Sequence, residues 1–167
     1  ISKKVLSALI SKRKKGQYLC TMPTYGYLKD KENKGKVIID EKASKVVKQI
    51  FNWRLQYKSY REILFELENL KIDAPYKHFY NLGLFKTVKY ANVKWNKESI
   101  NRILGNDFYI GKLTQGKSMQ TITNKGKKIY LPKEQWIVVE NNHIPIVDKD
   151  IFYKVQEINE YLKQKHF

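Results

Sequence analysis

Apolar residues recur every three or four positions in several stretches of the chain, the spacing that places them on one face of a helix. This spacing predicts helices near 41–57, 59–70, 97–104 and 148–164, and a stripe over residues 1–12 that is typical of the tail of an amphipathic helix. The side chains expected to face inward are Val46, Val47, Ile50, Phe51, Leu55, Ile63, Leu64, Leu67, Ile100, Ile103, Leu104, Ile151, Phe152, Val155, Ile158 and Leu162.

Helix start and stop signals agree with these boundaries. Asp40, Asn96 and Asp148 each precede an apolar stripe, where a short polar side chain can accept a hydrogen bond from the first helical turn. The segment Ser59-Tyr60-Arg61-Glu62 has the spacing of a capping box, with a serine and a glutamate three residues apart. Gly16 and Gly105 are placed to end helices.

Strand signals are concentrated in two places. A charged turn over 29–36 leads into the short strand 37–39. Residues 108–110 are expected to be extended and to enter a strand, so that 109–123 and 127–139 form a hairpin around the turn 124–127, which carries Asn and Gly. The tip of this hairpin is rich in lysine.

Two segments have no clear periodicity. Residues 17–23 are expected to form an extended arm. The aromatic segment 71–95 is expected to be a loop that packs on the core, with the alternative that its rings, or Lys86 and Lys89, contact a DNA backbone.

The predicted fold class is therefore α+β and mostly helical, resembling a winged helix with a β-hairpin wing. We expect residues 1–22 to be the end of a linking helix followed by a basic arm, and residues 23–167 to form a domain that ends in a C-terminal helix. Because the chain begins at Ile1 inside a helical pattern, we interpret it as part of a longer protein.

The net charge of +17 over 167 residues favours a polyanionic partner. Residues 1–29 contain seven Lys and Arg and no acid, and residues 108–133 contain six Lys and no acid. Such blocks predict two contact surfaces. No apolar run exceeds four residues, which excludes a membrane span, and the single Cys20 fits a reducing, cytoplasmic location.

Candidate contacts with duplex DNA lie in three places. The polar face of the helix at 97–104 would enter a major groove, with a guanidinium or an amide reading bases. The basic run and the arm would follow the backbone and the minor groove, and two further lysines belong to the hairpin. The candidate residues are Lys12, Arg13, Lys14, Lys15, Gln17, Tyr18, Lys97, Ser99, Asn101, Arg102, Lys112 and Lys117. An alternative role for Arg102 is an ion pair with Glu98 at i+4 spacing.

Catalytic and metal sites are not expected in this chain, and no cofactor is predicted. His78, His143 and His166 are not spaced with carboxylates or cysteine as metal ligands are, and no nucleophile stands beside a base.

Five segments, in this order, resemble the recombinase domain of the large serine recombinases, the phage integrases and transposases of the resolvase/invertase superfamily. They are PTYGY at 23–27, VKQIF at 47–51, SYREILFELENLKI at 59–72, WNKESINRILGNDFYIGKL at 95–113 and IPIVDKDIFYKVQ at 144–156. The chain departs from the family pattern at Lys71, where glycine is usual, at Asn96, where serine is usual, and in a long insertion over 73–94.

The resemblance implies a DNA-binding domain that positions a recombinase on one half of its attachment site, in company with other recombinase protomers. The serine chemistry would then belong to a catalytic domain before this segment. Two alternatives stay open: a free-standing winged-helix transcriptional regulator, and an RNA-binding protein that stacks bases on the aromatic segment.

Overall fold

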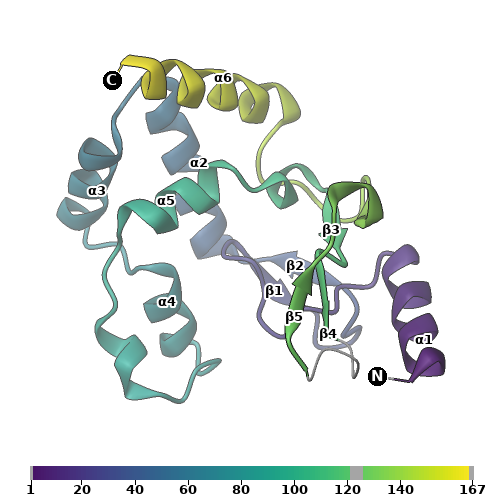
Figure 1. The fold of residues 1–167 in the computed structure, drawn as a ribbon. Coiled ribbons are helices and arrows are strands. Elements are labelled where there is room, and N and C mark those ends of the chain that lie inside the picture. The colour runs from purple at the N-terminus through teal and green to yellow at the C-terminus, as the bar shows by residue number, and fades with distance from the viewer. Residues whose placement is uncertain (1, 121–125, 166–167) are drawn as a thin grey trace. The chain divides into compact units, whose positions relative to one another are not determined.

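Helices make up most of the regular structure, as the apolar spacing predicts. A computed structural model describes residues 2–120 and 126–165 (Figure 1). The helices are α1 (Lys3–Lys14), α2 (Glu41–Leu55), α3 (Tyr60–Asn69), α4 (Pro75–Asn81), α5 (Lys97–Leu104) and α6 (Lys149–Lys165). The strands are β1 (Tyr27–Lys29), β2 (Val37–Ile39), β3 (Leu113–Gln115), β4 (Ser118–Gln120), β5 (Lys128–Tyr130) and β6 (Ile137–Val139). The predicted fold class, α+β and mostly helical, is confirmed.

The chain divides into two compact units, each built from two separate stretches. Unit 1 comprises residues 1–41 and 107–146, and unit 2 comprises residues 42–106 and 147–167. Helix α5 therefore belongs to unit 2, whereas the long hairpin belongs to unit 1. These units do not follow the predicted division at residue 22, which stays a prediction.

The core of unit 2 is made by the predicted inward faces of α2, α3, α5 and α6. Fully or almost fully buried side chains come from each of these helices: Val47, Ile50, Phe51, Ile63, Leu67, Ile100, Leu104 and Val155. The side-chain amide of Gln156 donates to the Leu104 carbonyl oxygen at 2.7 Å, which joins α6 to the end of α5. Val46, Leu55, Leu64, Ile151 and Leu162 were also predicted inward but are only half-buried, at the edges of these faces.

Helix α3 has defined hydrogen-bonded ends. The Ser59 side chain and the Glu62 carboxylate form the predicted capping box. Hydrogen bonds to this carboxylate from the backbone and hydroxyl of Ser59 lower the pKa of Glu62. At the other end the Ile72 N–H donates to the Leu67 carbonyl at 3.0 Å, and Lys71 has a φ of 52°, a left-handed conformation that favours glycine. The backbone at Lys71 thus has the geometry expected of the glycine that the resemblance implies at this position.

The prediction of a loop over 71–95 is wrong. Residues 75–81 form α4, and residues 88–92 form η1 (Val88–Asn92), a 3-10 helix. Aromatic side chains join the two, since the ring centroids of Phe85 and Tyr90 are 4.4 Å apart and those of Tyr76 and Tyr90 are 5.5 Å apart. Neither helix has a side-chain cap, so Pro75 at the first position of α4 was the start signal that the sequence offered.

Unit 1 is organised around buried tyrosines. The Tyr27 hydroxyl donates to the Ile144 carbonyl at 2.8 Å, and the Tyr109 hydroxyl donates to the Tyr25 carbonyl at 2.7 Å. Burial raises the pKa of both phenols. A small sheet pairs β1 with β2 in antiparallel register, Tyr27 opposite Ile39, and its first strand was not predicted.

The extended segment predicted at 108–110 is instead a 3-10 helix, η2 (Asp107–Ile110). All three of its predicted strand residues are buried, which a strand with alternating sides cannot achieve beside a single core. The chain then turns at Gly111, where φ is +87° and an added Cβ would lie 2.9 Å from the His143 carbonyl oxygen.

The long hairpin is present but interrupted. One antiparallel ladder pairs β3 with β6, and a second pairs β4 with β5. Between them lie Gly116, with φ of 73°, and on the opposite side Pro132 and a short 3-10 helix, η4 (Lys133–Gln135). Half of the predicted turn at 124–127, residues 124 and 125, falls outside the described residues.

Replacing Leu67 by alanine should lower the free energy of unfolding by roughly 2–5 kcal/mol, because a fully buried leucine leaves a cavity as well as losing its transfer energy. Chemical denaturation followed by circular dichroism measures this change. Phe65→Ala on the same helix is the control, since Phe65 is 62% exposed and should change stability far less. Equal losses for the two variants would contradict the assigned inward face of α3.

Candidate nucleic-acid interface

Helix α5 is held at its start by its own cap and by one aromatic side chain. The Ser99 N–H donates to Asn96 Oδ1 at 2.8 Å, and the Asn96 N–H donates to Ser99 Oγ at 3.2 Å, so the two residues form a reciprocal cap. Directly before the helix, the indole N–H of Trp95 donates to the Ile72 carbonyl at 2.9 Å. Ser99, one of the candidate contacts, is therefore engaged in the cap.

The exposed face of α5 is partly organised by Tyr60, the first residue of α3. The Tyr60 hydroxyl donates to Asn101 Oδ1 at 2.7 Å, and the Lys97 ammonium nitrogen lies 5.6 Å from the centre of the Tyr60 ring. Asn101 and Lys97 are both exposed. The amide nitrogen of Asn101 and the second lone pair of its oxygen remain for a partner outside the chain.

Arg102 lies in the last turn of α5 and is exposed. Among the ion pairs of residues 2–120 and 126–165, none joins Arg102 to Glu98. The predicted alternative, in which the guanidinium pairs with this glutamate, is not formed. The structure thus leaves the bidentate donor edge of Arg102 open to solvent.

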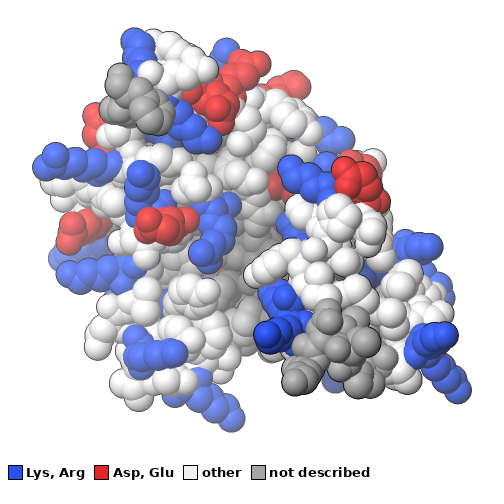
Figure 2. Space-filling model, in the orientation of Figure 1, with Lys and Arg blue, Asp and Glu red and all other residues white. Residues whose placement is uncertain are grey.

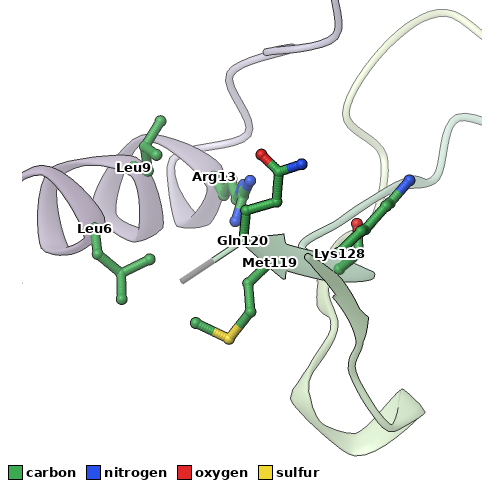
Figure 3. Close-up of a pocket in the computed structure, with 7 residues that line it drawn as sticks. Leu6, Leu9, Arg13, Met119, Gln120 and Lys128 are labelled. Carbon is green, nitrogen blue, oxygen red and sulfur yellow. The ribbon is translucent and has the colours of Figure 1, made fainter. Parts of the chain in front are cut away.

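The basic run 12–15 is the end of α1 in unit 1. Lys12, Lys14 and Lys15 are exposed, whereas Arg13 is half-buried. Figure 3 shows Arg13 in a groove of about 320 Å³, which α1 residues line on one side and residues of β4 and β5, including Lys128, line on the other. The predicted run therefore presents three lysines outward and turns its arginine toward the hairpin.

The predicted arm after Gly16 has no helix or strand over residues 17–20, but it is bound to unit 1 and is not free; its contact with DNA stays a prediction. The Gln115 side chain binds its backbone twice, accepting from the Leu19 N–H at 3.0 Å and donating to the Gln17 carbonyl at 2.8 Å. Tyr18 is only 5% exposed, and its hydroxyl donates to the Met22 carbonyl. Burial raises the pKa of Tyr18 to about 12. This candidate contact is a core residue of unit 1.

The two candidate lysines of the hairpin region differ in their surroundings. Lys112 is half-buried and forms ion pairs with Asp107 at 3.5 Å and Glu140 at 3.8 Å, so its charge is largely compensated. Lys117 is exposed, and its ammonium nitrogen lies 5.0 Å from the centre of the Trp136 ring. Lys117 is the better placed of the two to meet an anion.

The histidine of unit 1 does not form a catalytic pair. The His143 ring stacks on Phe108 with centroids 3.8 Å apart, and its Nε2 lies 2.6 Å from the Phe108 carbonyl oxygen. Burial lowers the pKa of His143 despite this hydrogen bond. Within the residues that the structure describes, no three His, Cys, Asp or Glu side chains are grouped as metal ligands.

A model of the Recombinase family matches residues 41–161, which is well over half of the chain. The chain belongs to the Recombinase family. This match confirms the resemblance that the five sequence segments indicate.

Comparison with solved structures shows the same fold. One is a crystal structure of an LSR–DNA complex, which matches 96% of this chain with a TM-score of 0.62 and 21% identity. Another concerns the sequence requirements of the Listeria innocua prophage attP site and matches 95% of this chain with a TM-score of 0.59 and 20% identity. This chain spans 39% and 52% of those two chains.

One curated relative also matches part of this chain. The uncharacterized protein YefB of Bacillus subtilis (strain 168) is 34% identical over 70 residues, which represent 42% of this chain and 23% of YefB. This Recombinase-family chain thus spans only part of the length of the relatives it matches.

One basic surface of this Recombinase-family chain was predicted only in part, through the alternative that Lys86 and Lys89 contact a DNA backbone. Residues 74–97 contain five lysines and no acid, and Lys86, Lys89 and Lys94 are exposed. On the face drawn in Figure 2, the surface over α4 at the lower left carries blue side chains but no red ones. The count of acid-free stretches that identified residues 1–29 and 108–133 would have identified this block as well.

None of the described helices has the length and apolar character to cross a membrane.

The Asn96 cap gives a test of how α5 is fixed. Asn96→Ala should lower the free energy of unfolding by roughly 0.5–2 kcal/mol, because the Ser99 N–H loses the Asn96 side-chain oxygen as its acceptor. Asn92→Ala is a matched control, since Asn92 is exposed in η1 and should have little effect. Thermal unfolding of both variants would decide this, and indistinguishable midpoints would show that the cap contributes nothing measurable.

Proposed function

We propose that this chain binds duplex DNA sequence-specifically, as the recombinase domain of a large serine recombinase, and positions that enzyme on one half of an attachment site. The observation that carries the proposal is the outward face of α5, where Lys97, Asn101 and Arg102 are all exposed on a short, capped helix. Helices of this kind present their side chains to base edges in a major groove. The shared fold with an LSR–DNA complex supports this interpretation.

Base recognition is assigned to Arg102 and Asn101. A guanidinium can donate two parallel hydrogen bonds to guanine O6 and N7, and an amide can pair with adenine N6 and N7. Asn101 enters such a contact already oriented, because Tyr60 holds its oxygen from α3. The side chain therefore gives up less conformational freedom when it binds the base.

Backbone contacts are assigned to the exposed lysines of both units. Lys12, Lys14 and Lys15 at the end of α1, Lys117 in the hairpin and Lys97 at the start of α5 carry charges suited to phosphates. Tyr18 is left out of these contacts because it is buried, and Lys112 contributes less because two carboxylates compensate it. Contacts of this kind orient a protein on DNA without reading its sequence.

Recombination itself would require parts of a longer protein. In the proposed parent, a catalytic domain before this segment supplies the nucleophilic serine, and further protomers occupy the other half-sites. The segment described here contributes DNA binding and orientation. This division of labour agrees with the small share of its relatives that the chain spans.

Arg102→Ala should weaken binding to a duplex selected by this chain from a random pool by roughly 1–3 kcal/mol, and weaken binding to a scrambled duplex much less. The reason is that base contacts exist only on the selected sequence. Fluorescence anisotropy with both duplexes at one salt concentration gives the specificity ratio, and Arg61→Ala on α3 is the control for losing an exposed arginine. Equal losses on both duplexes would remove α5 from base recognition. Tighter binding of the wild-type chain to structured RNA than to either duplex would overturn the proposed function.

Changing Lys14 and Lys15 together to alanine should weaken binding to all duplexes about equally. It should also make the slope of log affinity against log salt concentration shallower, by about 0.9 for each phosphate that is no longer neutralised. The control is Lys154→Ala, because the Lys154 ammonium is paired with Glu157 at 3.2 Å on α6. An unchanged slope in the double variant would place the end of α1 outside the interface.

A further inference from the structure

Unit 2 contains a groove of about 510 Å³ beside the start of α5. Arg54 from the end of α2 lines this groove together with Tyr60 and with Lys97 and Asn101 of the proposed DNA-contacting face. Asn159 of α6 also lines it. The groove is thus continuous with the surface assigned to DNA.

Arg54 is a buried cation without an internal counter-charge. Its side chain is 2% exposed, its Nη1 donates to the Lys58 carbonyl at 2.8 Å, and its guanidinium carbon lies 4.3 Å from the centre of the Tyr60 ring. In the described part of the chain, no carboxylate lies within ion-pair distance of it. The Nε atom is buried and has no hydrogen-bond partner.

Burying an unpaired arginine lowers the stability of the folded chain when no ligand is bound. Charged side chains are almost never fully buried unless they are paired, and an unpaired buried donor loses the hydration it had in the unfolded chain. One carbonyl and one aromatic face do not replace a carboxylate. The missing partner of Arg54 is therefore expected to come from outside the chain.

A second polar atom at the same groove also lacks a partner. Asn159 Oδ1 is buried and accepts no hydrogen bond. Rotation of the amide by half a turn would exchange its oxygen and nitrogen and offer a donor instead. Glu98 also lines the groove, but it is exposed and does not pair with Arg54. Together the unsatisfied groups and the nearby Lys97 favour an anion with several oxygen acceptors.

We propose that this groove binds a phosphate of the DNA backbone, with Arg54 as the buried cation that receives it. The Nε atom has almost no exposed surface, so an oxygen reaches it only when a groove side chain changes rotamer. A change of rotamer at Asn159 breaks no hydrogen bond to its side-chain oxygen, because this oxygen has no partner. The proposal rests on the proposed function, since Lys97 and Asn101 serve both. A phosphate held here would fix the angle at which α5 meets the bases.

Arg54→Met tests this assignment, because methionine keeps much of the volume and removes the charge. We expect the unfolding midpoint of the free chain to stay the same or rise, as happens when buried ionic groups are replaced by apolar ones of similar size. Affinity for duplex DNA should fall roughly ten- to a hundredfold, the range for a hydrogen bond to a charged group. The salt slope should also become shallower by about 0.9. A lower midpoint with unchanged affinity would make Arg54 a structural residue and overturn the proposal.

Asn159→Asp is a second variant that does not depend on tolerating the loss of Arg54. The new carboxylate would place a negative charge in the groove that Arg54 also lines, so the midpoint of the free chain should rise while affinity for DNA falls. Asn52→Asp, at an exposed position of α2, is the control for the change in net charge. A midpoint and an affinity that both match those of the control would overturn the proposal.

Inorganic phosphate serves as a direct probe in the absence of DNA. It should raise the unfolding midpoint of the wild-type chain more than sodium chloride does at equal ionic strength, and should not do so for Asn159→Asp. Equal effects of the two salts on the wild type would argue against an oxyanion site. The wild-type chain's preference for duplex DNA is measured separately, so a failure of the groove proposal is distinguishable from a failure of the proposed function.

Discussion

The ring of Tyr60 is the contact on which the polar side of unit 2 depends. One face of the ring meets the Arg54 guanidinium, its hydroxyl holds Asn101, and Lys97 lies within reach of its π-electrons. Three helices, α2, α3 and α5, thus meet at a single side chain. Its position is fixed in turn by the Ser59–Glu62 cap, which begins α3 directly before it. A short helix such as α5 gains little from its own propensity, so contacts like these decide where its side chains point.

The parts of the fold that follow from periodicity were predictable, and the parts that follow from tertiary contacts were not. Apolar spacing identified Ile63, Leu67, Ile100 and Leu104 as core residues because a helix has only one way to bury a stripe. Residues 108–110 were assigned to a strand, since three consecutive apolar residues carry no period. Only the packing of all three side chains into unit 1 distinguishes the 3-10 helix that forms there.

The candidate site was predictable to a similar extent. Exposed lysines and the outward face of α5 follow from helical phase alone. Arg54 does not, because a cation in the last turn of a helix is ordinarily a surface residue that complements the helix dipole. The burial of Arg54 depends on a tertiary contact, because Tyr60 of α3 lies over its guanidinium. For Tyr18 the sequence predicts exposure and the structure shows burial. A tyrosine beside a basic run resembles a nucleic-acid contact, but Gln115, far along the chain, binds the backbone on both sides of Tyr18 within unit 1.

Burial of Arg54 also bears on how binding and stability are related in this domain. A net stability of only about 5–15 kcal/mol is usual for a domain, so an uncompensated buried charge removes a substantial share of it. Selection for folding alone would favour an apolar residue at this position, because a methionine or leucine would fill the same space without the desolvation cost. The proposed phosphate would restore the interactions that Arg54 loses on folding, and it would do so only in the complex with DNA. Binding of the proposed phosphate would then stabilise the arrangement of α2, α3 and α5 around Tyr60, and α5 would be most rigid when the DNA backbone beside it is engaged.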